Sequence, residues 1–128
     1  MSDRRELRVE GLPEPISHYT DAVRAGDLLF VSGCVPVDAA GNLVAGDVVA
    51  QTRQVFRNIA LVLDAADVGF GDVVKVTVFL TDIGDRAAVN TVREEVFGAS
   101  RPASTLVEVS KLAIPGARIE VEAVACVP

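Results

Sequence analysis

The distribution of apolar and polar residues predicts a long helix in the first half of the chain. Between residues 47 and 66, small or apolar side chains recur at steps of three or four, in one stripe suited to burial: Val48, Thr52, Val55, Ile59, Val62 and Ala66. Asp47 suits the N-cap, because its carboxylate accepts hydrogen bonds from free N–H groups of the first turn. The polar residues are expected largely on the opposite side: Gln51, Arg53, Gln54, Arg57, Asn58 and Asp64.

A second helix and several strands are predicted from the same kind of pattern. The helix covers residues 85–97, stops at Gly98 and buries three apolar side chains, Val89, Val92 and Val96. Residues 22–32 predict a hairpin, after a weak alternation at residues 7–9. Two strands near residues 105–109 and 118–126 finish the chain. The clearest strand covers residues 73–81, with one face expected to carry Val74, Val76, Val78 and Leu80.

The order of these elements predicts an α+β fold with a single mixed β-sheet of about six strands and two helices packed on one face. A length of 128 residues corresponds to a single domain, residues 1–128. The predicted helices cover only one face of the sheet, although 50% of the residues are hydrophobic. Large exposed apolar patches usually mark interfaces, so we expect the chain to form an oligomer.

Charge and cysteine content argue against several classes of function. A net charge of −6 disfavours nucleic-acid binding, which depends on Lys and Arg neutralising phosphates. Cys34 and Cys126 are too few for a disulfide framework or a zinc site. No apolar run approaches the length of a membrane span, and no apolar signal-peptide core follows Met1. We therefore expect a soluble, cytoplasmic protein without nucleic-acid or membrane partners.

Two carboxylates share one face of the last predicted strand. Glu120 and Glu122 alternate with the apolar residues 119, 121 and 123, so they point away from the helices. Carboxylates at a partly buried interface tend to have raised proton affinity, which suits proton transfer. The alternative is that both are solvated strand residues paired with Arg118 or Lys111.

Several motifs in order resemble the Rid family, the YjgF-type reactive-intermediate deaminases. The segment GDLLFVSGCVP at residues 26–36 is similar to the family's GNLVFVSGQIP, and VKVTVFLTD at residues 74–82 is similar to a family strand. The pair Val89-Asn90 and the segment RPASTLVEV at residues 101–109 complete the resemblance. It covers residues 15–125, nearly the whole chain.

The resemblance implies a fold, an assembly and a reaction. Rid proteins have a chorismate-mutase-like fold and form homotrimers with a cleft at each subunit interface. Their deaminase branch adds water to an imine or enamine and releases ammonia, without a metal or organic cofactor. By position, Glu120 would handle protons and the attacking water, and Tyr19 would line the cleft. The substrate-binding positions would be Ser32, Gly33, Asn90, Ser104, Thr105 and Leu106.

The chain departs from the family's closing motif at the position of the substrate-binding arginine. Ser104 stands there, and Leu106 replaces a residue that is often Cys. A guanidinium holds a carboxylate with two parallel charge-assisted hydrogen bonds, which a hydroxyl cannot reproduce. We therefore expect a substrate other than 2-aminoacrylate, with an aminomuconate-type compound as one candidate. Whether Arg101, Arg24 or His18 replaces the missing arginine stays open.

Other interpretations exist for Tyr19 and for two neighbours of the predicted cleft residues, His18 and Cys34. Consecutive side chains of an extended segment point in opposite directions, so His18 and Tyr19 are not expected to enter the cleft together. Tyr19 also fits an interface packing role. Cys34 has no identifiable base beside it and is interpreted as a small buried hydrophobic residue.

Two classes of function fit these observations. The leading hypothesis is a Rid-type hydrolase that releases ammonia from an imine or enamine. The alternative is a non-catalytic trimer of the same family whose clefts bind a small metabolite. Endoribonuclease activity, attached to some family members, is disfavoured by the acidic charge and the lack of an aromatic and basic stripe.

Overall fold

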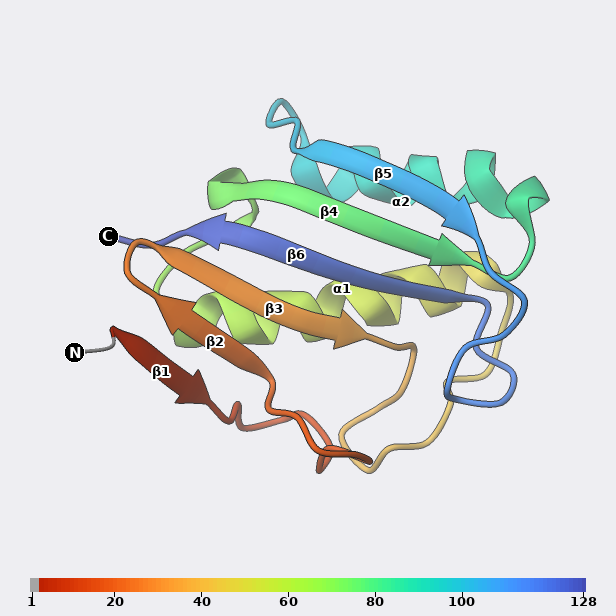
Figure 1. The fold of residues 1–128 in the computed structure, drawn as a ribbon. Helices are drawn as coiled ribbons and strands as arrows, with labels where there is room; N and C mark the ends of the chain where they lie inside the picture. The colour runs from red at the N-terminus through yellow and green to blue at the C-terminus, as the bar shows by residue number, and fades with distance from the viewer. Residues whose placement is uncertain (1–2) are drawn as a thin grey trace.

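The computed structural model describes residues 3–128 and contains one six-stranded sheet with two α-helices on one of its faces (Figure 1). The strands are β1 (Arg4–Leu7), β2 (Ala22–Ala25), β3 (Leu28–Cys34), β4 (Val73–Leu80), β5 (Ala103–Glu108) and β6 (Ile119–Cys126). Their spatial order is β1-β2-β3-β6-β4-β5, and β4 with β5 is the parallel pair. The predicted single mixed sheet is confirmed.

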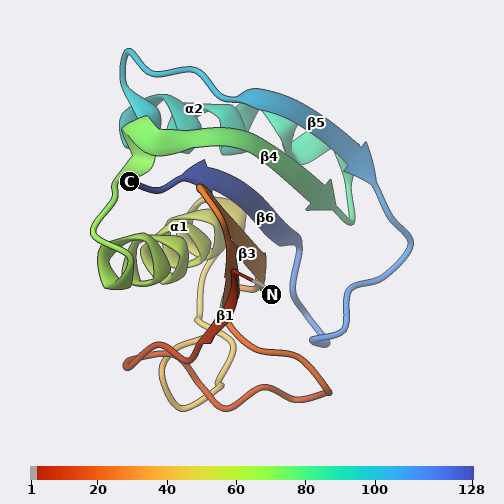
Figure 2. The ribbon, with the colours of Figure 1, turned by 60° about the vertical axis from the view of Figure 1, so that its left-hand side comes forward.

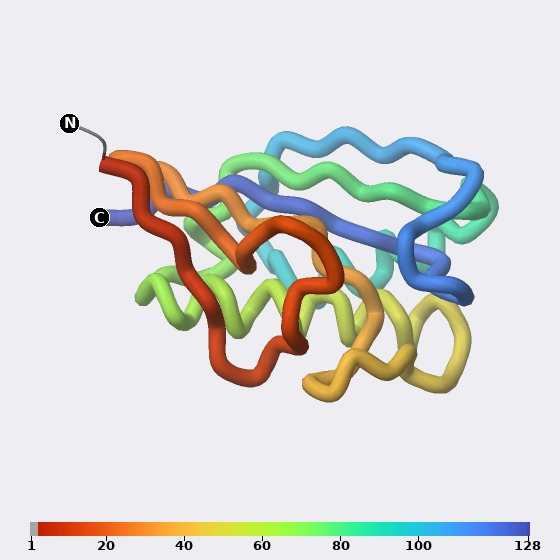
Figure 3. The backbone as a smooth tube through the Cα atoms, turned by 60° about the horizontal axis from the view of Figure 1, so that its bottom comes forward, coloured from red at the N-terminus to blue at the C-terminus, as the bar shows by residue number. Residues whose placement is uncertain are grey.

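Both predicted helices are present and lie on the same side of the sheet (Figures 1 and 3). The first, α1 (Val48–Ala65), begins at Asp47, whose side chain accepts a hydrogen bond from the Ala50 N–H at 3.0 Å. The second, α2 (Arg86–Phe97), ends at Gly98, which adopts a positive φ of 59°. Short 3₁₀ turns, η1 (Phe70–Asp72) and η2 (Ile83–Asp85), precede β4 and α2.

The polar side of α1 differs from the prediction at two positions. Gln51 and Asn58 were expected largely on the outer side, and both are buried. The Gln51 amide accepts a hydrogen bond from the Arg118 N–H and donates one to the Gly116 carbonyl. The burial of these two side chains is tolerated because hydrogen bonds to backbone groups far away in the sequence replace the hydrogen bonds that their amides would make with water.

Two strand details also differ from the prediction. A register irregularity between Val73 and Lys75 makes Val74 an extra residue, so Val73 is buried and Val74 is 43% exposed. The first strand covers Arg4–Leu7, where the weak alternation had indicated residues 7–9. The last strand has the predicted alternation, because Ile119, Val121, Ala123 and Ala125 are buried beneath the helices.

The face of the sheet opposite the helices is uncovered in the described chain (Figure 2). Phe30 of β3 is 46% exposed on this face. Around it lie Lys75, Thr77, Glu122 and Val124, which with Phe30 line a shallow depression. No helix within residues 3–128 is long and apolar enough to cross a membrane.

Candidate functional site

Glu120 lies on β6, directly over the backbone of Gly33. A Cβ atom at position 33 would overlap the Glu120 carboxyl group and lie 2.9 Å from its Cδ atom. This approach occurs where the pairing of β3 with β6 shifts register between Val31 and Cys34. Partial burial, reinforced by the negative charge of Glu122, raises the pKa of Glu120 above its ordinary value. The carboxyl is therefore suited to accept and return protons nearer to neutral pH.

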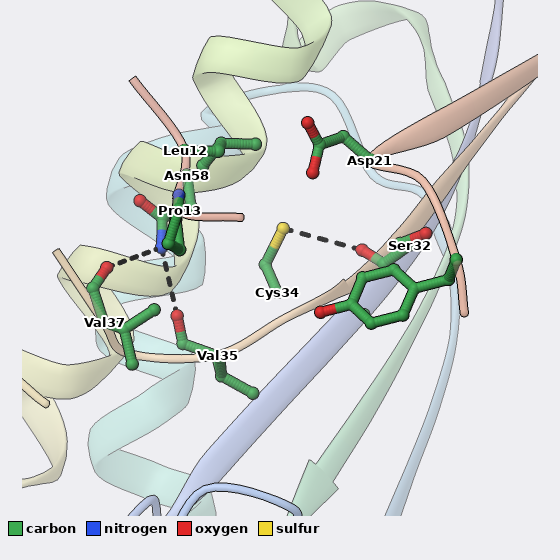
Figure 4. Close-up of a pocket in the computed structure, with 10 residues that line it drawn as sticks. Leu12, Pro13, Asp21, Ser32, Cys34, Val35, Val37 and Asn58 are labelled. Atoms are coloured by element: carbon green, nitrogen blue, oxygen red, sulfur yellow. Dashed lines mark hydrogen bonds between the residues drawn. The ribbon is translucent and has the colours of Figure 1, made fainter. Parts of the chain in front are cut away.

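Three predicted cleft residues line a small hollow, and one of them, Gly33, also contacts Glu120, which does not itself line the hollow. Tyr19, Ser32 and Gly33 line it, together with Asp21 and Cys34 (Figure 4). His18 is exposed and does not line the hollow, so only Tyr19 of this pair does, although the segment bends at His18 instead of being extended. The enclosed volume is about 50 Å³, whereas small-molecule pockets usually span about 300–1,000 Å³. The hollow in one chain is too small to enclose a substrate.

Hydrogen bonds hold the walls of this hollow in place. The Ser32 hydroxyl donates to the Thr20 carbonyl at 2.6 Å. Asp21 accepts from the Val9 N–H at 2.7 Å and forms an ion pair with Arg8. These contacts tie the segment before β2 to β3, so the positions of Tyr19 and Ser32 follow from buried polar contacts.

Asn58 of α1 is a wall residue that the sequence analysis did not predict. Its side-chain amide donates to the carbonyls of Val35 and Val37, both at 3.0 Å (Figure 4). The segment after β3 is thereby fixed to the helix, on the side of the hollow that Leu12 also lines (Figure 4). A polar residue inside the apolar stretch of α1 was the signal that could have indicated this role.

Cys34 fits the interpretation of an unreactive thiol. Burial, with smaller contributions from the charges of Asp21 and Glu120, raises the pKa of Cys34 to about 12. A thiol with this pKa is protonated at neutral pH and is a poor nucleophile. Its sulfur points toward the Ser32 carbonyl, at 3.5 Å (Figure 4).

A second group of predicted residues lies at the β5 edge of the sheet, between α2 and β5. Asn90 and Ser104 line a cleft of about 460 Å³, together with Arg101 and Arg93. The Arg93 guanidinium donates to the Ser104 hydroxyl at 2.7 Å. Arg93 was missed by the sequence analysis, because an arginine on the polar side of a helix carries no distinguishing pattern.

The remaining predicted residues of β5 lie apart from this cleft. Thr105 is on the uncovered face and accepts a hydrogen bond from Lys75 Nζ at 2.7 Å. Leu106 packs against the hydrophobic core. Arg24 bonds the carbonyls of Gly26 and Pro128, away from both groups. Of the arginines considered in the sequence analysis, only Arg101 therefore lines the cleft with Ser104.

The two groups are separated within one chain. Ser104 is the sheet partner of buried Val76 and faces α2. Glu120 is the partner of Phe79 and points to the face without helices. One copy of the chain therefore does not bring the candidate acid/base and the Ser104 cleft together. No cluster of His, Cys, Asp or Glu within residues 3–128 is arranged to hold a metal ion.

Comparison with known proteins identifies the family. The family described as endoribonuclease L-PSP matches residues 10–127. The chain belongs to this family. A RutC family protein from Pyrococcus horikoshii is 47% identical over 117 residues, which are 91% of this chain and 92% of that protein. The Salmonella typhimurium protein named 2-iminobutanoate/2-iminopropanoate deaminase is 39% identical over 94% of this chain and 96% of its own length.

Solved structures confirm the fold and the resemblance to Rid proteins. A Yersinia pestis protein of the conserved Rid family has a TM-score of 0.92 and 35% identity, covering 97% of this chain and 99% of its own. The structure of E. coli TdcF with bound serine has a TM-score of 0.89 and 31% identity, again covering 97% and 99%. The family member from E. coli thus holds a small amino acid on the fold that this chain adopts.

Proposed function

We propose that this family member is a hydrolase that releases ammonia from an imine or enamine. The observation that carries the proposal is the Glu120 carboxyl, which lies over Gly33 and has a pKa raised by burial. The deaminase names of the Salmonella and E. coli relatives support the reaction class. A carboxyl of raised proton affinity suits a reaction in which a proton must be both removed and returned.

In this proposal, Glu120 acts as base and then as acid. Water adds to the carbon of the protonated C=N bond, an iminium ion, and Glu120 removes one proton from the water. The resulting carbinolamine carries a hydroxyl and an amino group on one carbon. Glu120 returns its proton to the amino nitrogen and the C–N bond breaks, while the hydroxyl passes its proton to the departing ammonia, which leaves a carbonyl product and an ammonium ion. No redox partner, metal or organic cofactor is required for this balance.

The neighbouring residues would orient the substrate. Tyr19, placed on the rim of the hollow, would cover the reacting carbon, and Ser32 and Gly33 would border it. Asn90, Ser104, Thr105 and Leu106 would contribute from the β5 edge. Because Ser104 carries no charge, β5 itself supplies no cation for a carboxylate, and aminomuconate-type compounds belong among the substrates to test.

The proposal includes a homotrimer with a cleft at each subunit interface. Three features support it: the uncovered sheet face, the hollow of only about 50 Å³ beside Glu120, and the separation of the Ser104 cleft from Glu120 within one chain. Placing the β5 edge of one copy against the Tyr19 end of another would bring both groups into one cleft. The proposal also includes the cytoplasmic location expected from the composition.

Ammonia release from freshly generated imines tests the proposed reaction. The substrates would be imines made by an amino-acid oxidase from several amino acids, together with 2-aminomuconate. We expect Glu120→Gln to lower kcat by about 10²–10⁴-fold while the protein still folds. Glu122→Gln is the matched control, because the same change on the same face should retain most of kcat at its own optimum.

Two results would contradict hydrolysis. Undiminished turnover by Glu120→Gln would remove Glu120 from the mechanism. Binding of small metabolites without turnover of any imine would favour the alternative, a non-catalytic metabolite-binding trimer of the same family.

A further inference from the structure

Within residues 3–128, Arg93 is a half-buried cation without an acidic partner. No carboxylate within residues 3–128 forms an ion pair with it, whereas Arg53 and Arg118 pair with Glu95 and Asp85. Burial lowers the pKa of the Arg93 guanidinium, the direction expected where no anion offsets lost hydration. An arginine nonetheless stays protonated at neutral pH. The site therefore holds a positive charge that an anionic ligand would stabilise.

The geometry leaves most of the guanidinium free for such a ligand. A guanidinium has five N–H donors in a planar fork, and a single side-chain hydrogen bond, to the Ser104 hydroxyl at 2.7 Å, is found for Arg93. This contact fixes one Nη atom against β5. The remaining donors match the two oxygens of a carboxylate, which arginine binds with parallel hydrogen bonds.

The surrounding cleft has the size and charge for a small organic anion. Its volume is about 460 Å³, within the usual range for small-molecule pockets. Arg101 adds a second positive charge to the lining. The one acidic lining residue, Glu94, accepts a hydrogen bond from the Asn90 amide at 2.9 Å. Phe97 provides an apolar wall for the carbon chain of a ligand.

We propose that Arg93 of α2 binds the substrate carboxylate, replacing from the helix the arginine that β5 lacks at Ser104. This inference rests on the proposed function and narrows its substrate class to imino acids with a free carboxylate. Ser104 then acts as a positioning residue that orients the guanidinium. The cleft would therefore still be specific for a carboxylate, although β5 carries no arginine at the position of Ser104.

The test measures ligand affinity directly, by calorimetry or NMR titration, with two probes. The first is 2-oxobutanoate, the keto-acid product of 2-iminobutanoate hydrolysis, and the second is its uncharged methyl ester. We expect the acid to bind wild type at least tenfold more tightly than the ester. Arg93→Ala should lose about tenfold or more of the affinity for the acid and leave the ester unaffected.

Further variants separate charge, geometry and folding. Arg93→Lys keeps the charge without the fork, so its affinity for the acid should fall between wild type and Arg93→Ala. Arg86→Ala, on an exposed position of the same helix outside the cleft, is the matched control and should bind normally. Adding Ser104→Arg to Arg93→Ala should restore binding, because it returns a guanidinium to the same cleft. Circular dichroism checks that each variant folds.

The outcomes separate this inference from the proposed reaction. Equal binding of acid and ester, unchanged acid affinity in folded Arg93→Ala, or no binding by wild type would overturn the role of Arg93. Loss confined to Arg101→Ala would also overturn it, by moving the anchor to Arg101. If turnover requires Glu120 but is unchanged in Arg93→Ala, the proposed reaction stands and the carboxylate-binding role of Arg93 is rejected. If binding of 2-oxobutanoate requires Arg93 but no imine is turned over, the binding role stands and the proposed reaction is rejected.

Discussion

Two regions of the sheet, its centre at β3 and β6 and its edge at β5, carry opposite chemistry. At the centre, Glu120 lies over Gly33 near Asp21 and a protonated Cys34, so negative charge and raised proton affinity dominate. At the β5 edge, Arg93 and Arg101 line a wider cleft, and Arg93 has no acidic partner within residues 3–128. The central region is suited to move protons, and the β5 edge is suited to bind an anion.

The separation of these two regions explains why neither is a complete site. If Arg93 lay beside Glu120, the two would form an ion pair, which would hold the Glu120 pKa down and neutralise the cation. Placing them on different strands and faces of one chain preserves both properties until copies of the chain assemble. In the proposed trimer, the substrate itself would separate the two charges.

The largest expected effect comes from filling the space over Gly33. Gly33→Ala introduces a Cβ that must displace the Glu120 carboxyl, and we expect kcat for imine hydrolysis to fall about 100-fold or more. Because the displaced group is a flexible side chain, the melting temperature should change little. Gly69→Ala, where a Cβ meets nothing within 4 Å, is the control. Full activity in Gly33→Ala would contradict the assignment of Glu120 as the acid and base of the reaction.

Mixing two impaired variants, assayed at substrate concentrations well below KM, tests whether Glu120 and Arg93 meet between subunits. Glu120→Gln and Arg93→Ala are unfolded together in equal amounts and refolded, so that mixed trimers form. We expect about a quarter of the clefts to pair an intact Glu120 with an intact Arg93 from another copy, and activity to return in proportion.

Two controls accompany the mixing experiment. Either variant refolded alone should keep only its own residual activity, and the double variant carrying both changes should restore nothing when refolded with Glu120→Gln. Sedimentation measures the oligomeric state of every sample. Trimeric mixtures that stay inactive would show that Glu120 and Arg93 do not share a cleft.

A smaller effect concerns stability and pH. A carboxyl whose pKa is raised in the folded state costs folding free energy where it is ionised, above that pKa, and costs nothing below the unfolded pKa of about 4.3. Glu120→Gln should therefore raise the melting temperature by a few degrees at pH 8 and converge with wild type near pH 4. Melting curves across this range check the sign, and a destabilised Glu120→Gln at pH 8 would contradict it.

The smallest expected effect is a shift in the pH profile. Glu122 contributes, after burial, to the raised pKa of Glu120. Glu122→Gln should lower that pKa and move the acidic limb of the kcat/KM profile to lower pH, with the plateau unchanged. Phe30→Leu, a change on the same face that removes no charge, should leave the limb in place. An unmoved limb in Glu122→Gln would indicate that another group controls it.

The sequence predicted the elements better than the contacts between them. Periodicity located both helices and the apolar face of β6, because burial imposes periods that a single segment displays. It misplaced Gln51 and Asn58, whose backbone partners lie 21–67 residues away along the chain. A local pattern can mark such a residue as buried, but it does not identify a distant partner.

The candidate site shows the same limit. The motif comparison predicted Glu120, Tyr19, Ser32 and Gly33, and the last three line one hollow. The same comparison showed that Ser104 stands where the family has its substrate-binding arginine. Arg93 could not be predicted as its neighbour, because their contact depends on how α2 packs across β5.

Asn58 has a consequence for how ligands reach the molecule. By holding the carbonyls of Val35 and Val37, it fastens the segment after β3 to a helix, so this wall of the hollow is fixed before a ligand arrives. A ligand captured in the assembled cleft would meet a preformed wall, and its capture would be governed by diffusion instead of by movement of this segment. Association rates should accordingly fall in proportion as solvent viscosity rises.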